Sequence, residues 1–263
     1  MVMRFTRKRV LLLVAFVLLG GCGCNEPSRE AVAAMETFEQ LLQSAEDDKC
    51  VISPQEKRFA EVRRKYARLY DALISIPGKR ERTQVAMRME KRLLETITPR
   101  PSGFDEYDFF LRSNIMFHAL VQAVWETTGD ERRVLAFWER RRRKCIAAAE
   151  RSEREEAQLK QDYRRLLANG YRISARMARV SMKELTEEEQ ATLNECMEKR
   201  PKIVERLRGL DFLNGPRGWY RLGVPGTEGA ALADGKLYER FQKLSQKELD
   251  ELVNQYRYDQ GGI

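Results

Sequence analysis

The sequence predicts an all-α protein, built as a bundle of amphipathic helices with one long charged helix and a Gly/Pro-rich loop near the C-terminus. Two observations favour this fold class. Apolar residues recur every three to four positions along most of the chain, and no alternating apolar run of strand length occurs. The composition, 43% hydrophobic and 33% charged over 263 residues, excludes a wholly disordered, collagen-like or multi-span membrane protein. A chain of this length can also bury a core without disulfides or metal.

The predicted helical domain, residues 28–208, opens with two capped amphipathic helices. Ser28 stands at the N-cap of a helix that runs to Asp47, and Ser53 with Glu56 forms a capping box for a second. The apolar stripes of the two helices are Ala31, Met35, Phe38, Leu42 and Ala45, then Phe59, Val62, Tyr66, Leu69, Leu73 and Ile76. Both helices should pack these stripes against a common core.

The next two helices differ in character. Residues 79–97 carry one stripe, formed by Val85, Met89 and Leu93, and a loop with two prolines follows. Residues 105–127 are apolar nearly all round, which is typical of a helix in the middle of a bundle.

A turn at 127–130 leads into a long charged helix that we expect to end before Asn169 and Gly170. Its middle, residues 150–158, has no large apolar residue, so we expect that part to project or to cross solvent.

Two further helices complete the predicted domain. Ile173 to Val180 has the spacing of a short helix, and Thr186 with Glu189 forms a capping box for another that extends to about Gly209, with a bend at Pro201.

The C-terminal part of the chain differs in composition from the helical part. Residues 209–235 hold seven glycines and two prolines, which predicts a long loop of functional or flexible character. Residues 236–263 predict a helix pair packed on the same domain, its second helix capped by Ser245 and Glu248.

The N-terminus carries the strongest functional signal. Residues 1–9 are basic, residues 10–19 form an unbroken apolar run, and Gly20, Gly21 and Cys22 follow. The apolar run is too short to span a bilayer, which needs about 20 residues, so the segment predicts a cleaved export signal rather than a helical anchor. An uncleaved anchor, or a secreted protein cut near Gly21 or Gly23, is the alternative interpretation.

Residues 18–22, Leu-Leu-Gly-Gly-Cys, resemble the lipobox of bacterial lipoproteins. The resemblance implies that 1–21 is removed, that Cys22 carries diacylglycerol and an acyl chain such as palmitate, and that 22–27 forms a lipidated tether. It further implies an exported, lipid-anchored protein of the cell envelope, at the outer membrane if the organism has one. Two or three acyl chains make such an anchor effectively permanent.

The net charge of +8 owes four positive charges to the signal segment, and removal of residues 1–21 leaves +4. This ordinary balance does not call for a nucleic-acid partner. One basic run, Arg140, Arg141, Arg142, Arg143 and Lys144, could contact anionic headgroups, and the alternative is a solvated helix face.

Export also bears on the remaining cysteines, because disulfides persist outside the cytoplasm. We expect a disulfide between Cys145 and Cys196, or from Cys50 to one of them. The alternative is that Cys145 and Cys196 are buried and unbonded.

Catalytic and metal chemistry finds little support in the sequence. His118 is the only histidine, so two-histidine zinc motifs are excluded and no metal or cofactor is expected. Asn114, His118, Gln122 and Glu126 recur every fourth residue, either as a polar groove with a general base or as a partly exposed stripe. No catalytic residue can be assigned.

The residues Arg217, Trp219, Tyr220 and Arg221 in the Gly/Pro-rich loop have the composition of interface anchors, or of a loop packed on its own domain. The sequence therefore favours a lipid-anchored, non-enzymatic helical protein that uses its anchor to bind the membrane and its helical body to bind an unknown envelope protein. The alternatives are an envelope enzyme acting on cell-wall or lipid substrate through carboxylates, and a holdase-like chaperone.

Overall fold

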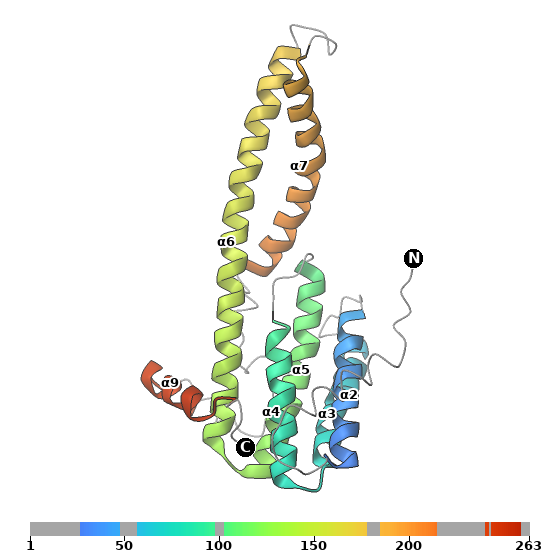
Figure 1. Cartoon of the computed structure of the whole chain (residues 1–263), viewed down its shortest axis with the longest axis vertical. Helices are drawn as coiled ribbons and strands as arrows, with labels where there is room; N and C mark the ends of the chain where they lie inside the picture. The colour runs from blue at the N-terminus through green and yellow to red at the C-terminus, as the bar shows by residue number, and fades with distance from the viewer. Residues whose placement is uncertain are drawn as a thin grey trace. The chain divides into compact units, whose positions relative to one another are not determined.

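The protein is all-α, as predicted (Figure 1). The structure is a computed structural model that describes residues 27–47, 57–97, 103–177, 185–214, 240–241 and 243–258. These residues form seven helices and contain no strand. They divide into two compact units, so the predicted domain 28–208 is shared between them. Unit 1 comprises residues 1–97, 108–143 and 224–263, and unit 2 comprises 98–107 and 144–223.

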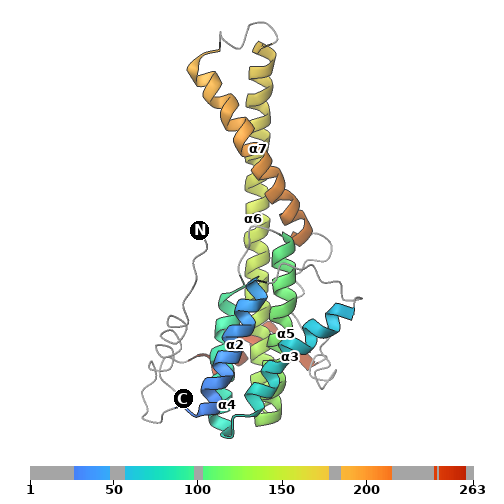
Figure 2. The same cartoon turned by 90° about the vertical axis from the view of Figure 1, so that its right-hand side faces the viewer.

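Unit 1 begins with three helices that contact one another: α2 (Arg29–Asp47), α3 (Lys57–Ile74) and α4 (Lys79–Glu95). Figures 1 and 2 show them lying side by side. The predicted cap is confirmed, because the backbone N–H of Ala31 donates to Oγ of Ser28 at 3.1 Å. The capping box at Ser53 and Glu56 lies outside the described residues.

The core of unit 1 lies among α2, α3, α4, the part of α5 (Gly103–Thr128) from residue 108 onward and the start of α6 (Glu131–Met177). Residues 116–121 of α5 are all buried, which fits the predicted central position of this helix. Asp130 caps α6, because its Oδ1 accepts from the N–H of Arg133 at 3.1 Å. The side chains of Val134, Leu135, Phe137 and Trp138 then enter the core.

The predicted end of the long helix at Asn169 and Gly170 is wrong, because α6 continues to Met177. A glycine costs a helix about 1 kcal/mol relative to alanine, which tertiary contacts can offset. A Cβ at Gly170 would lie 3.9 Å from Sγ of Cys196, and Ile173, one turn further on, is buried. Packing against the next helix therefore overrides the local stop signal, and the short helix predicted from Ile173 is the end of α6.

In unit 2, α6 from residue 144 onward pairs with α7 (Glu187–Asn214), which runs back along it (Figure 1). The predicted capping box is confirmed: Oγ1 of Thr186 accepts from the N–H of Glu189 at 3.3 Å, and Glu189 accepts from the N–H of Thr186 at 2.9 Å. Pro201 lies inside α7. The helix extends beyond Gly209, so the first residues of the predicted loop 209–235 are helical, and residues 215–235 lie outside the described part of the chain.

The last helix of unit 1 is α9 (Gln246–Gln255). Its predicted capping box between Ser245 and Glu248 is confirmed, and Leu244 and Leu249 both pack on the core of unit 1. The first helix of the predicted C-terminal pair lies mostly outside the described residues. None of the described helices combines the length and the apolarity needed to cross a bilayer.

Candidate functional site

The basic run 140–144 does not form the solvated or headgroup-facing surface considered from the sequence. Arg140 is buried, and its Nε and Nη2 donate to the two carboxylate oxygens of Glu90 on α4, each at 2.8 Å. Its Nη1 donates to the carbonyl oxygen of Tyr256 at 2.7 Å. The guanidinium also lies 4.8 Å from the ring centres of Phe137 and Tyr258. Arg140 therefore binds α4 and the C-terminal segment to α6.

Arg141 is fully buried, with 0% of its surface exposed. Its guanidinium lies 5.1 Å and 4.8 Å from the ring centres of Phe110 and Phe117 on α5, and Nη2 donates to Oγ of Ser113 at 3.4 Å. The headgroup prediction is therefore wrong for Arg140 and Arg141, because neither side chain can reach a lipid surface. Their positions on α6 face the bundle, where aromatic rings and a carboxylate stabilise the two cations.

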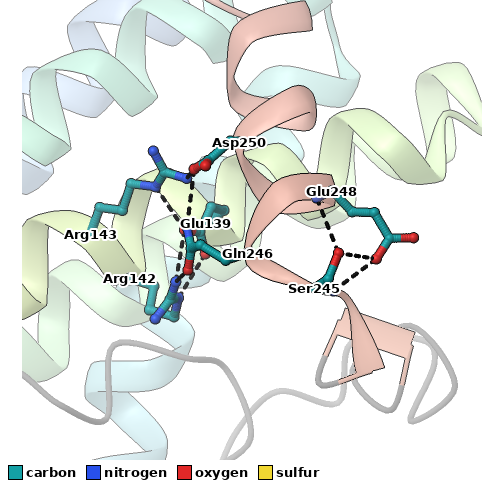
Figure 3. Close-up of polar contacts among 7 residues, drawn as sticks. All are labelled: Glu139, Arg142, Arg143, Ser245, Gln246, Glu248 and Asp250. Carbon is teal, nitrogen blue, oxygen red and sulfur yellow. Dashed lines mark hydrogen bonds and ion pairs between the residues drawn. The ribbon is translucent and has the colours of Figure 1, made fainter.

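Arg142 and Arg143 converge on a second buried carboxylate, that of Glu139 (Figure 3). Arg142 donates to its two oxygens at 2.6 Å and 2.8 Å, and Arg143 donates at 2.7 Å. Arg143 also bonds Asp250 of α9, which Figure 3 shows facing this cluster. These ion pairs connect α9 to α6. Lys144 alone of the basic run is exposed.

Burial is the largest cause of the shifted pKa values of two titratable groups in unit 1, Glu90 and His118. Burial raises the pKa of Glu90, against the opposing effect of Arg140, and both carboxylate oxygens are occupied by that arginine. Burial and the cations Arg141 and Arg63 lower the pKa of His118 to about 3. Neither ring nitrogen of His118 has a hydrogen-bond partner among the described residues. Such a histidine is neutral and a weak base, which does not support the general-base interpretation.

The polar stripe around His118 is divided in the structure. Gln122 donates to Glu126 at 3.0 Å, and Glu126 accepts a hydrogen bond from Tyr70 of α3. His118 is 9% exposed, whereas Glu126 is exposed. These residues therefore do not form one polar groove. The described residues also contain no cluster of histidine, cysteine and acidic side chains able to hold a metal ion.

In unit 2, the contacts between α6 and α7 fix the register of an antiparallel hairpin. Glu155 accepts two hydrogen bonds from Arg206, at 2.7 Å and 2.8 Å, and Arg200 lies 6.0 Å from the ring centre of Tyr163. Nearer the connection, Arg176 bonds Glu189 at 2.6 Å. Each step forward along α6 is thus matched by a step backward along α7.

This register separates the two cysteines predicted to pair. Sγ of Cys196 donates to the carbonyl oxygen of Leu166 at 3.4 Å and lies beside Gly170. Cys145 lies about 30 Å further back along α6 at 1.5 Å per residue, whereas bridged Cα atoms lie within about 7 Å. Both cysteines are buried and no bond joins them, so the predicted Cys145–Cys196 disulfide is not formed. Cys50 lies outside the described residues.

The hairpin also carries the two large apolar side chains that stand out as exposed in the described part of the chain. Tyr171 is 72% exposed and Met197 is 70% exposed. Gly170 and Cys196 face each other across the hairpin. Tyr171 directly follows Gly170, and Met197 directly follows Cys196. In two antiparallel helices, that step turns both side chains by about 100° toward the same side. Tyr171 and Met197 therefore lie on one face of the hairpin.

We call the surface around this pair the hairpin face. By helical spacing it includes Arg164, Leu167 and Tyr171 of α6 and Leu193, Met197 and Arg200 of α7. The sequence does not single out this surface, because the glycine before Tyr171 predicts a helix end and Met197 lies in a strongly charged segment. Tyr171 and Met197 each directly follow a residue of the contact between Gly170 and Cys196, so the surface can be recognised only once that contact is known.

The other predicted site residues lie outside the described part of the chain, namely Cys22, Arg217, Trp219, Tyr220 and Arg221. Their predicted roles in lipidation and in an interface stay predictions. Comparisons of this chain with protein-family models, with curated proteins and with solved structures find no match.

Proposed function

We propose that this chain is a lipid-anchored, non-enzymatic helical protein of the cell envelope that binds another envelope component through its helical body. The proposal has two parts, an anchor and a binding surface. The lipobox-like residues 18–22, with a basic segment and an apolar run before them, support acylation of Cys22.

The binding surface rests on one observation, the pairing of Tyr171 and Met197 on the hairpin face with about 70% of each side chain exposed. Aromatic residues, methionine and arginine are enriched in interfaces, and this face has all three. Most other large apolar side chains that the structure describes are covered, so this pair is the most specific candidate for contact with another molecule.

Metabolic labelling with a fatty-acid analogue tests the anchor. We expect label on the wild-type chain and none on Cys22→Ser, which should remain unprocessed or become soluble. Label that persists on the serine variant would contradict acylation at this residue.

Site-specific photo-cross-linking in intact cells tests the binding surface. A photoreactive amino acid is placed at position 171 or 197, and at position 165 as a control, because Arg165 is exposed and pairs with Asp162 on another side of α6. We expect adducts with lipid or protein at 171 and 197 but not at 165. Equal yields at all three positions, or none at 171 and 197, would refute the proposed surface. A fourth position, 219, tests the loop residues Trp219 and Tyr220 in the same way.

A further inference from the structure

The hairpin face differs in charge from the other side of the same hairpin. Two of its six residues are arginines, and none is acidic. Positions that extend this face by helical spacing include Glu153, Glu156, Lys160 and Ala175 of α6 and Gln190, Val204 and Arg208 of α7, and Lys160 is paired with Glu156 at 2.5 Å. The centre of the face therefore combines apolar side chains with Arg164 and Arg200 and has no acidic residue, whereas the end near Lys160 also holds carboxylates.

On the other side, three cations are paired with carboxylates. Glu155 pairs with Arg206, Asp162 with Arg165 at 3.3 Å, and Glu195 with Lys199 at 2.7 Å. By helical spacing these pairs lie away from Tyr171 and Met197. The two sides of one hairpin thus differ in chemistry: paired charges mark the one, and the centre of the other is apolar with two arginines.

We propose that the hairpin face lies on an anionic lipid surface, with Tyr171 and Met197 at the boundary between headgroups and acyl chains and Arg164 and Arg200 among the lipid phosphates. Interfacial helices combine an apolar strip with basic residues in this way. The inference names the envelope component that the hairpin face binds. It rests on the proposed function, because acylation of Cys22 is what brings the chain to a membrane.

The proposed lipid anchor favours a lipid surface over other occupants. Arg29, where α2 starts, is seven positions after Cys22, and the chain between these two residues spans at most about 25 Å whatever its conformation. An acylated Cys22 therefore keeps the chain at a bilayer, and a high effective concentration of headgroups makes even a weak surface contact productive.

Charge and area argue against two other occupants. A second copy of the same face would place Arg164 and Arg200 against like charges, which is unfavourable. Two exposed side chains and their neighbours also provide less than the roughly 800 Å² per partner of a stable protein interface. A chain that Cys22 already anchors to a bilayer needs only a weak additional contact to hold the hairpin face on the lipid surface.

Vesicle flotation with the unlipidated chain tests this inference independently of the anchor. The protein is residues 22–263 with Cys22→Ser, and the probes are vesicles of phosphatidylcholine alone or mixed in equal parts with phosphatidylglycerol. We expect binding to the phosphatidylglycerol vesicles that falls as salt rises.

Two neighbouring arginines supply a matched pair of variants. Arg164 lies on the hairpin face and Arg165 does not, yet both are exposed and each charge reversal is the same chemical change. We expect Arg164→Glu to weaken vesicle binding on the order of tenfold and Arg165→Glu to leave it nearly unchanged. Tyr171→Ser with Met197→Ser should also weaken it severalfold, with helix content by circular dichroism unaltered because both side chains are exposed.

Any of three results in purified protein would overturn the inference. They are no preference for phosphatidylglycerol, equal effects of Arg164→Glu and Arg165→Glu, and a dimer in sedimentation that Tyr171→Ser dissociates. A protein adduct at position 171 in cells together with no vesicle binding would also overturn it and would leave the proposed function standing. Loss of acylation, in contrast, would contradict the anchor while leaving the vesicle result intact.

Discussion

Arg140 and Glu90 form a two-point ion pair between α6 and α4, with both hydrogen bonds at 2.8 Å and both side chains buried. The residues are 50 positions apart in the sequence. The same guanidinium donates to the backbone of Tyr256, so one side chain connects α4, α6 and the C-terminal segment.

We predict that Glu90→Ala lowers the free energy of unfolding by about 3–5 kcal/mol, because it leaves the guanidinium of Arg140 buried without its carboxylate. Denaturant unfolding at neutral pH measures this change. The control is Glu95→Ala on the same helix, whose carboxylate is half exposed beside Arg92 and should contribute less than about 1 kcal/mol. Similar losses in the two variants would contradict a structural role for the Arg140–Glu90 pair.

A second prediction concerns the attachment of α9. Glu139→Gln should weaken the bonds from Arg142 and Arg143, because an amide offers one acceptor oxygen where the buried carboxylate offers two. We expect faster proteolytic cleavage near α9 and a loss of about 2–4 kcal/mol of stability.

The exposed partner of this cluster supplies the comparison. Asp250→Asn removes only the outer ion pair with Arg143 and should cost about 0–1 kcal/mol. If Asp250→Asn were as damaging as Glu139→Gln, the stabilisation would lie in the exposed pair instead of the buried one.

A third prediction uses the pKa of His118. The folded chain holds it at about 3, and the unfolded chain returns it to about 6.5. Between these values the unfolded state binds a proton that the folded state does not, so stability is fully present above about pH 6.5 and is lost as the pH falls, by up to about 1.4 kcal/mol per pH unit.

His118→Leu isolates this contribution, because carboxylates also titrate in the same range. The variant should be about as stable as the wild type at neutral pH, since neither ring nitrogen has a hydrogen-bond partner to lose among the described residues. Its stability should fall less steeply between about pH 6 and about pH 4. Parallel pH profiles for the two proteins would show that folding does not lower the pKa of His118.

Local patterns predicted the helices well, and long-range partners explain what the patterns missed. The caps at Ser28, Thr186 and Ser245 depend on side chains within three residues, so the sequence reveals them directly. The burial of Arg140 and Arg141 depends on Glu90 and on aromatic rings of α5. These partners are distant in the sequence, so no local pattern predicts them. A run of five basic residues is ordinarily solvated, which is why the sequence indicated an exposed surface there.

The helix end predicted at Gly170 failed for the related reason that α7 packs on α6 at this point. Cys196 lies beside Gly170, and its thiol donates to the carbonyl oxygen of Leu166. The hairpin face follows from this contact. It could not be recognised until the register of α6 and α7 was known, because Tyr171 and Met197 lie 26 positions apart.

The fourth prediction tests that register directly. Gly170→Cys should form a disulfide with Cys196 under mild oxidation, because a Cβ at residue 170 would lie 3.9 Å from Sγ of Cys196 and meet no closer atom. Replacing a helical glycine also removes its entropic penalty of about 1 kcal/mol, so the reduced variant should be no less stable than the wild type. Mass spectrometry of the unreduced, digested protein identifies the linked peptides.

Asn169→Cys serves as the control for Gly170→Cys, because its side chain is turned by about 100° from the facing position and should not pair with Cys196. The wild-type cysteines should remain unlinked to each other under the same oxidation, since the helical rise places Cys145 about 38 Å from the position of Gly170. A disulfide between Cys145 and Cys196, or equal cross-linking of the two variants, would mean that α7 pairs with α6 in another register. In that case Tyr171 and Met197 would no longer share a face, and the lipid-binding surface would lose its geometric basis.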